Sequence, residues 1–205
     1  MREDWSNVSD ARRAELFPIV LESHNPQWKG YYLEESAFLK SVFGDSMTRI
    51  SHIGSSAVPG LIAKPTIDIL VEISSGTDLK EITERLLDTG YVANYPKGDI
   101  IMYIKGYTPR GWEGQAMHVH VRYNADWGEL YFRDYLIQHH EVAQEYEKLK
   151  IMLKEKYTFD RDGYTDAKGA FITKHTQQAR QEFPDRYMPL NKCHDYPARI
   201  STANQ

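Results

Sequence analysis

Cysteine, long apolar runs and surplus positive charge are all scarce in this sequence. Cys193 is the single cysteine among 205 residues, so no disulfide can form within the chain, and this scarcity favours a reducing compartment. No apolar run reaches the roughly 18 residues that a membrane-spanning helix needs. The first ten residues are polar and lack the apolar core of a signal peptide. We therefore expect a cytoplasmic protein without a membrane partner.

The charge balance also limits the class of partner. Lys and Arg together number 25 against 29 Asp and Glu, which gives a net charge of −4 at pH 7. Sequence-independent binding to a nucleic-acid backbone needs a surplus of basic residues, so a nucleic-acid partner is not expected. The hydrophobic fraction of 41% and the charged fraction of 26% lie near globular averages and allow a sizeable core.

Hydrophobic periodicity predicts strands and helices in a mixed order. Alternation is clearest in residues 67–73, where aliphatic side chains share one face of a strand and Asp68, Leu70 and Glu72 share the other. A loop is predicted at 106–114. Further strands are predicted at 19–21, 47–53, 100–105 and 117–123. Helices are predicted at 10–16, 26–43, 78–88, 127–140, 141–156 and 164–183.

The order of these elements indicates the fold class. Strands come first and helices gather toward the C-terminus, which is typical of an α+β fold and not of a doubly wound sheet. A chain of this length forms one domain by default. We therefore predict a single domain at 19–183, preceded by an N-terminal extension at 1–18 and followed by a C-terminal tail at 184–205.

The densest group of polar and small residues lies at positions 52–68, which read HIGSSAVPGLIAKPTID. The turn Gly54-Ser55-Ser56 lets backbone N–H groups and hydroxyls approach an anion closely. Asp68, near the start of the next strand, could hold a divalent metal beside that anion, and Lys64 could reach a phosphate. The alternative is a plain tight turn followed by an edge aspartate. The spacing of a P-loop is absent.

A second polar group lies in the predicted strand 117–123. His118, His120 and Arg122 share one face of it, and could bind a metal and a phosphate or supply acid–base catalysis. The alternative is a partly exposed strand whose histidines only form hydrogen bonds. Because this strand and the Asp68 strand each have an aliphatic opposite face, we expect both in one mixed sheet, with their polar faces turned toward the same cleft.

Other polar residues have simpler interpretations. His52 is predicted to order the turn that follows it through a backbone hydrogen bond, and Arg133-Asp134 to form a local ion pair. His139-His140 is predicted to cap a helix junction. The lysines at positions 148, 150, 154 and 156 alternate with acidic residues and predict a solvated helix face.

Several motifs resemble the GrpB family, which belongs to the nucleotidyltransferase-like superfamily. The resemblance runs from about Ile19 to Arg180 and is densest over residues 52–69. Its supporting motifs are Asn25-Pro26-x-Trp28, His118-Val119-His120-Val121, Phe132-Arg133-Asp134-Tyr135-Leu136, Tyr146-x-x-Leu149-Lys150 and Tyr164-x-x-x-Lys168. The resemblance implies a nucleotidyltransferase-like mixed sheet flanked by helices, with further helices toward the C-terminus.

The resemblance also implies a chemistry, from which this sequence departs at one position. Superfamily members carry Gly-Ser on a turn and an acid-x-acid pair on the next strand, which binds the metal that activates the phosphates of a nucleotide. Gly54-Ser55 and Asp68 match this pattern, but Leu70 replaces the second acid. Glu72 is one step further along and is expected to lie too far away to bind the same ion. The departure counts against two-metal nucleotidyl transfer.

Three functions are compatible with these residues. The first is binding of a nucleotide or other phosphate ligand with Mg²⁺, or with Mn²⁺ or Zn²⁺, and nucleotidyl transfer to an unidentified acceptor. The second is a non-catalytic nucleotide- or cofactor-binding module. The third is a metal-dependent hydrolase that uses His52 together with the histidines of strand 117–123. The candidate catalytic residues are Asp68, His118 and His120, with Asp68 as the metal ligand. Phosphate contacts are expected from Gly54, Ser55, Ser56, Lys64 and Arg122.

Overall fold

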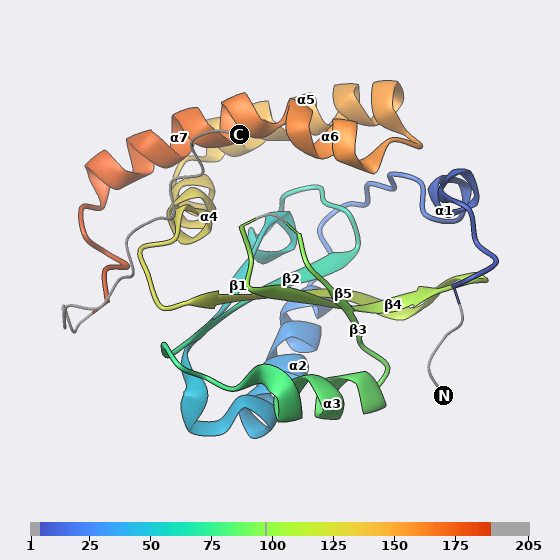
Figure 1. The fold of residues 1–205 in the computed structure, drawn as a ribbon. Helices are drawn as coiled ribbons and strands as arrows, with labels where there is room; N and C mark the ends of the chain where they lie inside the picture. Colours follow the sequence, from blue (N-terminus) through green and yellow to red (C-terminus); the bar gives the residue numbers. More distant parts are fainter. Residues whose placement is uncertain (1–4, 97, 190–205) are drawn as a thin grey trace, which may run out of the picture.

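The structure, a computed structural model, describes residues 5–96 and 98–189. Its centre is a five-stranded sheet in the order β1-β2-β5-β4-β3. The strands are β1 (Met47–Ile53), β2 (Thr66–Ile73), β3 (Val92–Asn94), β4 (Ile101–Thr108) and β5 (Gly111–Tyr123). β2 and β5 pair in parallel, and the other neighbouring strands are antiparallel. The sheet is therefore mixed, as predicted, and lies between two helical layers (Figure 1).

One face of the sheet is covered by α2 (Gln27–Phe43) and α3 (Leu79–Asp88), which are drawn below it in Figure 1. The aliphatic face of β2 packs there against Trp28 and Leu39 of α2 and Leu86 of α3. Each of these three side chains is at most 1% exposed. Truncating such a leucine to alanine typically costs about 2–5 kcal/mol. The predicted alternation of residues 67–73 is thus confirmed by the main core.

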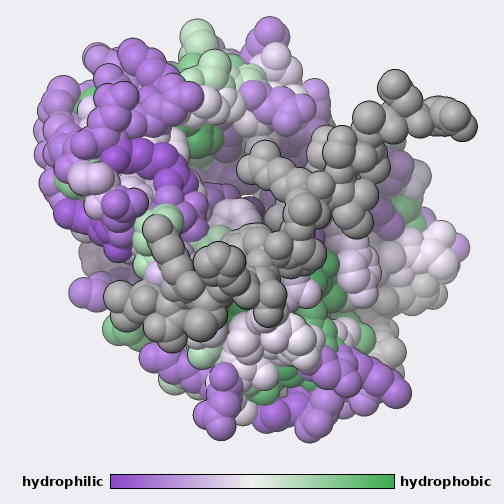
Figure 2. Space-filling view, turned by 60° about the vertical axis from the view of Figure 1, so that its left-hand side comes forward, coloured by the Kyte–Doolittle hydropathy of each residue, from purple (hydrophilic) through white to green (hydrophobic). Residues whose placement is uncertain are grey.

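The opposite face of the sheet lies under α4 (Gly128–Gln138), α5 (His140–Tyr157), α6 (Arg161–Ala167) and α7 (Gly169–Glu182). Leu70 of β2 and Ile53 of β1 pack against Leu130 of α4 in a small apolar cluster. On this face of β2, therefore, Leu70 packs against apolar side chains and Asp68 does not. The surface seen in Figure 2 is mainly hydrophilic, and its hydrophobic residues appear in small separate groups.

The predicted helix boundaries are close to the observed ones in the first half of the chain. α1 (Asp10–Leu16) begins after Ser9, whose side chain accepts a hydrogen bond from the Arg12 N–H. α2 begins at Gln27, and Asn25 accepts from the N–H of that residue. Gly44, with φ of 54°, ends α2 as predicted.

Two predicted strand and loop assignments are wrong. Residues 19–21 form no strand, because Ile19 donates its N–H to the Thr158 carbonyl, and Glu22 and Ala63 make only an isolated bridge. The predicted loop 106–114 is mostly strand, because β4 and β5 continue into a hairpin. Gly106, with φ of 87°, permits the bulge there, and a Cβ at this position would lie 2.8 Å from the Ala116 backbone.

The C-terminal helices also differ from the prediction. The single helix expected at 164–183 is divided into α6 and α7 at Lys168, whose N–H bonds to the Thr165 carbonyl. α6 begins earlier than expected because Asp160 caps it by accepting from the Gly163 N–H. Tyr187, in the predicted tail, packs on α4 with its ring 5.1 Å from that of Tyr131. Cys193 lies outside the described residues. Within those residues no helix is both long and apolar enough to cross a bilayer.

Candidate functional site

Asp68 and His118 lie opposite each other across the parallel strands β2 and β5. His118 Nδ1 is 3.2 Å from Asp68 Oδ1, and His120 Nε2 is 3.6 Å from the same oxygen. Because His120 is two residues beyond His118 on β5, both imidazoles emerge on the Asp68 face of the sheet. The prediction that these side chains share one face of a mixed sheet is confirmed. The three residues offer ligand atoms that all lie within 4.8 Å of one another.

Gly54 lies against the side chain of Asp68, which leaves no space for a Cβ at position 54. Its φ of 72° and ψ of −174° belong to a region that only glycine adopts readily. A Cβ on this residue would lie 2.6 Å from Asp68 Oδ2, which is closer than side-chain atoms approach. The turn that ends β1 therefore needs glycine for its backbone angles and for the carboxylate beside it.

The two imidazoles of the site are each held by a second polar group. His120 Nδ1 lies 3.1 Å from Asp99 Oδ2, which leaves Nε2 directed at Asp68. His118 Nε2 lies 2.9 Å from the Tyr107 hydroxyl, which leaves Nδ1 directed at Asp68. Outer hydrogen bonds of this kind fix the ring orientation of histidines that bind metals.

Electrostatics divide the roles of the three residues. Burial alone would raise the pKa of Asp68, but hydrogen bonds from His118 and His120 and their charges hold that pKa far below its usual range. Burial, with the charges of Lys64 and His120, lowers the pKa of His118 despite its bond to Asp68. Burial alone would also lower the pKa of His120, yet hydrogen bonds to Asp68 and Asp99 and their charges raise it to about 9. A metal that binds His120 must therefore displace a proton.

Two lysine ammonium groups gather near Asp68. The Nζ atoms of Lys64 and Lys168 lie 5.8 and 4.3 Å from the centre of the Tyr164 ring. Burial and the charge of Arg161 lower the pKa of Lys64, and burial and the charge of Lys64 lower that of Lys168 to about 8, while Asp68 opposes both shifts. Within the described part of the chain, neither ammonium forms an ion pair with a carboxylate. Cations that crowd together in this way favour an anionic ligand.

Lys150 contradicts the solvated helix face predicted for α5. Its side chain is 2% exposed, and it donates a hydrogen bond to the Ile62 carbonyl. Glu147, one turn earlier, accepts from the N–H of Ile62 at 3.3 Å. Burial and the charge of Lys168 lower the pKa of Lys150 to about 7. These contacts hold the connection that carries Lys64 against α5.

The sequence contained a signal for Lys150 that its charge obscured. The residue continues the buried stripe of α5, which consists of Val142, Ala143, Tyr146, Lys150 and Leu153. Lys168 had only its family motif as a signal. Asp99 lies between β3 and β4, in a segment that no predicted element included, and only the fold brings it to His120.

The serines of the turn have different environments. Ser56 is 3% exposed, and its hydroxyl lies 3.2 Å from His52 Nε2. The His52 ring stacks on Tyr32 at 4.8 Å between centres. His52 therefore contacts the turn through its side chain and not through the predicted backbone hydrogen bond, and it lies outside the group of three clustered ligands. Ser55 is partly exposed. Burial raises the pKa of Tyr146, and a hydrogen bond with Ser55 lowers it by a smaller amount.

Arg122 already has two anionic partners. It donates to Asp99 Oδ1 at 2.5 Å and to Glu129 Oε1 at 2.6 Å. Its predicted phosphate contact therefore competes with two carboxylates. Glu72, two residues beyond Leu70 on β2, is fully buried and pairs with Arg49. Neither Leu70 nor Glu72 therefore provides a second acid beside Asp68.

Comparison with known proteins gives a family match, similar sequences and a similar solved structure. A family model described as GrpB protein matches residues 18–178. The glutamate-rich protein GrpB of Alkalihalophilus pseudofirmus is 34% identical over 163 residues, which are 75% of this chain and 91% of that protein. The crystal structure of conserved protein GrpB from Enterococcus faecalis gives a TM-score of 0.70 at 27% identity, and the match covers 80% of this chain and 99% of that one.

A more distant relative is a larger protein. A dephospho-CoA kinase of Mycolicibacterium paratuberculosis is 27% identical over 176 residues, which are 74% of this chain and 43% of the kinase. The family match, in contrast, spans most of this chain and includes the Gly54 turn, Asp68 and the histidines of β5. The chain therefore belongs to the GrpB protein family.

Proposed function

We propose that the protein binds a nucleotide or a similar phosphate ligand together with one divalent metal ion. The observation that carries this proposal is the meeting of Asp68, His118 and His120 on one sheet face, beside the ammonium groups of Lys64 and Lys168. A carboxylate and two imidazoles suit a cation, whereas adjacent lysines suit an anion. A metal–phosphate ligand satisfies both requirements at once.

The three clustered side chains fit a metal in their chemistry. One carboxylate and two imidazoles form the donor set of many open metal sites, in which further positions remain for substrate or water. Asp99 supports this assignment because it binds the far nitrogen of His120, as in carboxylate–histidine–metal arrangements. Nitrogen donors favour Zn²⁺ or Mn²⁺ over Mg²⁺, which prefers oxygen ligands.

Phosphate oxygens would be met by positive charge and by backbone donors. Lys64 and Lys168 supply the charge, and the turn Gly54-Ser55 supplies N–H and hydroxyl groups. A bound metal would act as a Lewis acid on a phosphoryl oxygen. The residues of this chain would orient the phosphates and exclude competing anions. Nucleotidyl transfer to an unidentified acceptor extends this proposal and requires chemistry with Asp68 as the single β2 acid at the site.

The kinase relative supports a nucleotide-like ligand. The name of that protein denotes a kinase that acts on dephospho-CoA, and its likeness to this chain covers 43% of its length. A domain that accompanies such an activity is compatible with ligands that join a nucleotide to phosphate groups.

A metal-dependent hydrolase is the second candidate, and the two imidazoles favour it. Histidine ligands are common in zinc hydrolases, in which the metal lowers the pKa of the attacking water. His52 has no part in this version, because its ring is committed to Ser56 and Tyr32. A non-catalytic binding module would use the same ligands without turnover.

Calorimetric titration tests the proposed function. ATP is titrated into the wild-type protein, Asp68→Asn and the control Asp88→Asn, with Mg²⁺, Mn²⁺ or Zn²⁺ present. Asp88 is an exposed residue at the end of α3. We expect metal-dependent binding that is strongest with Mn²⁺ or Zn²⁺, that Asp68→Asn abolishes and that the control retains. Binding that is independent of metal, or that survives in Asp68→Asn, would overturn the proposal.

A further inference from the structure

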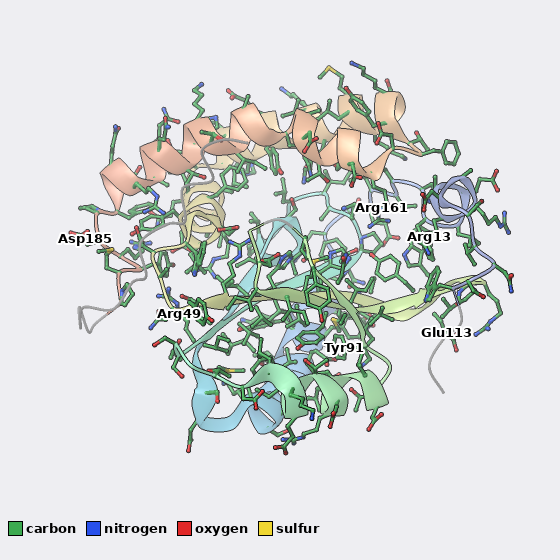
Figure 3. The ribbon with its side chains drawn as sticks, viewed as in Figure 1. Arg13, Arg49, Tyr91, Glu113, Arg161 and Asp185 are labelled. Carbon is green, nitrogen blue, oxygen red and sulfur yellow. The ribbon has the colours of Figure 1, made fainter. Side chains whose placement is uncertain are left out.

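A pocket of about 710 Å³ opens between α1, the β3–β4 edge of the sheet and the start of α6. Its volume lies within the range of roughly 300–1,000 Å³ that is typical of small-molecule sites. Its walls include Trp5, Ala14 and Phe17 from the N-terminal segment, Ile104 from β4 and Phe159 before α6. Figure 3 shows that Arg13 and Arg161, which also line the pocket, lie at this end of the molecule.

The pocket adjoins the metal-ligand cluster through shared side chains. His118 lines the pocket and also contacts Asp68. The Tyr107 hydroxyl, 2.9 Å from His118 Nε2, accepts a hydrogen bond from Arg161 at 3.3 Å. Arg161 is also near enough to Lys64 to lower its pKa. A ligand in the pocket would therefore lie beside His118 and Arg161, which adjoin Asp68 and Lys64.

The N-terminal segment builds one wall of this pocket. It contributes Trp5, Asp10, Arg13, Ala14 and Phe17, all of which precede the family match at residues 18–178. Phe17 is 5% exposed, and its ring lies 5.0 Å from that of Tyr107. Arg161 also donates to the Phe17 carbonyl at 3.2 Å. The segment is therefore docked onto the family domain and gives the pocket a shape that the family region alone does not provide.

We propose that this pocket binds the planar heteroaromatic ring of a nucleotide whose phosphates lie at Lys64 and Lys168, an inference that rests on the proposed function. The apolar side chains in the lining suit a ring of nucleobase size, and aromatic side chains such as Trp5 and Phe159 can stack on it. Phe159 is 60% exposed, so its ring face is accessible to a ligand. Asn94 and Asp162 place polar atoms among these walls for the edge of the ring.

Filling the pocket tests this inference. Ala14→Phe adds a ring on the pocket side of α1, whereas Ala11→Phe makes the same change at an exposed residue of α1 that does not line the pocket. The two variants have equal helix propensity, and equal thermal midpoints would show that both are folded. ATP and inorganic tripolyphosphate are titrated into each protein in the presence of Mn²⁺.

We expect Ala14→Phe to weaken ATP binding by about tenfold or more and to leave tripolyphosphate binding unchanged, because only ATP carries a ring. Ala11→Phe should bind both ligands as the wild type does. ATP should quench tryptophan fluorescence, and Trp5→Phe should remove most of that change. Equal binding of ATP and tripolyphosphate by the wild type, or no effect of Ala14→Phe on ATP, would overturn the ring site while leaving the proposed function intact. Failure of both ligands to bind would overturn the two proposals together.

Discussion

Replacing Gly54 by alanine should destabilise the protein through two separate effects. The first is conformational, because φ of 72° with ψ of −174° lies in a region essentially restricted to glycine, which costs a residue with a Cβ about 1–3 kcal/mol. The second is steric, because the new Cβ would lie 2.6 Å from Asp68 Oδ2 and 3.3 Å from Asp68 Cβ. Asp68 has little freedom to move away, since its other oxygen lies beside His118 and His120. Such overpacking typically costs a further amount of about 1–3 kcal/mol.

Gly60 provides the matched control for this change. Its φ is 77°, but a Cβ there would meet no atom within 4 Å. Gly60→Ala should therefore show a conformational cost alone, about 1–2 kcal/mol, whereas Gly54→Ala should reach about 2–6 kcal/mol. Urea denaturation at a fixed pH, without added metal, measures the free energy of unfolding of both variants.

A double-mutant cycle isolates the contact with Asp68. In an Asp68→Ala background the carboxylate is absent, so the cost of Gly54→Ala should fall by its steric part, about 1–3 kcal/mol. Two results would refute this reasoning: equal costs for Gly54→Ala and Gly60→Ala in the wild-type background, or an unchanged cost of Gly54→Ala after removal of the carboxylate.

Three further predictions follow from other side chains of the site. The pKa of Lys150 is about 7 in the folded protein against 10.5 when unperturbed, so the unfolded state binds more protons between these pH values. Lys150 therefore makes the free energy of unfolding rise as pH rises from about 7 to 10.5. Lys150→Met should flatten that gain in urea titrations across this range, and an unchanged slope would contradict it. Lys168→Met should weaken tripolyphosphate binding by about tenfold, measured by calorimetry, while the exposed control Lys174→Met should not. Asp99→Asn should weaken Zn²⁺ or Mn²⁺ binding by about 10–100-fold in a competition with a chelator, whereas Asp88→Asn should leave it unchanged; equal affinities would remove the orienting role of Asp99.

Much of the fold was predictable because its signals are local. The alternation in residues 67–73 identified the interior strand β2 and its core-facing side, and Ser9 and Gly44 marked helix ends. β3 was not predicted, because three residues are too few to show a period. The hairpin of β4 and β5 was taken for a loop because glycine and proline usually mark loops, whereas Gly106 here accommodates a bulge within a strand.

The candidate site was predictable only where strand periodicity decides the outcome. Alternation alone placed Asp68 on the polar face of one strand, and His118 with His120 on the polar face of a second strand. The parallel register of these two strands brings the three side chains together. Lys150 was assigned to solvent because charged residues are rarely buried, and the hydrogen bond that offsets its burial comes from a distant connection. Asp99 and Lys168 reach the site from segments far away in the chain, which no local pattern reports.

The double attachment of Ile62 has a mechanical consequence. Lys150 and Glu147 hold both the carbonyl and the N–H of this residue, and the neighbouring Ala63 bridges to Glu22. The connection into β2 is thereby fastened to a helix of the upper layer and not only to the sheet. A displacement of α5 would consequently carry the Lys64 ammonium with it while Asp68, fixed in the sheet, stayed in place. The separation between the Lys64 ammonium and the metal-binding residues thus depends on the position of α5.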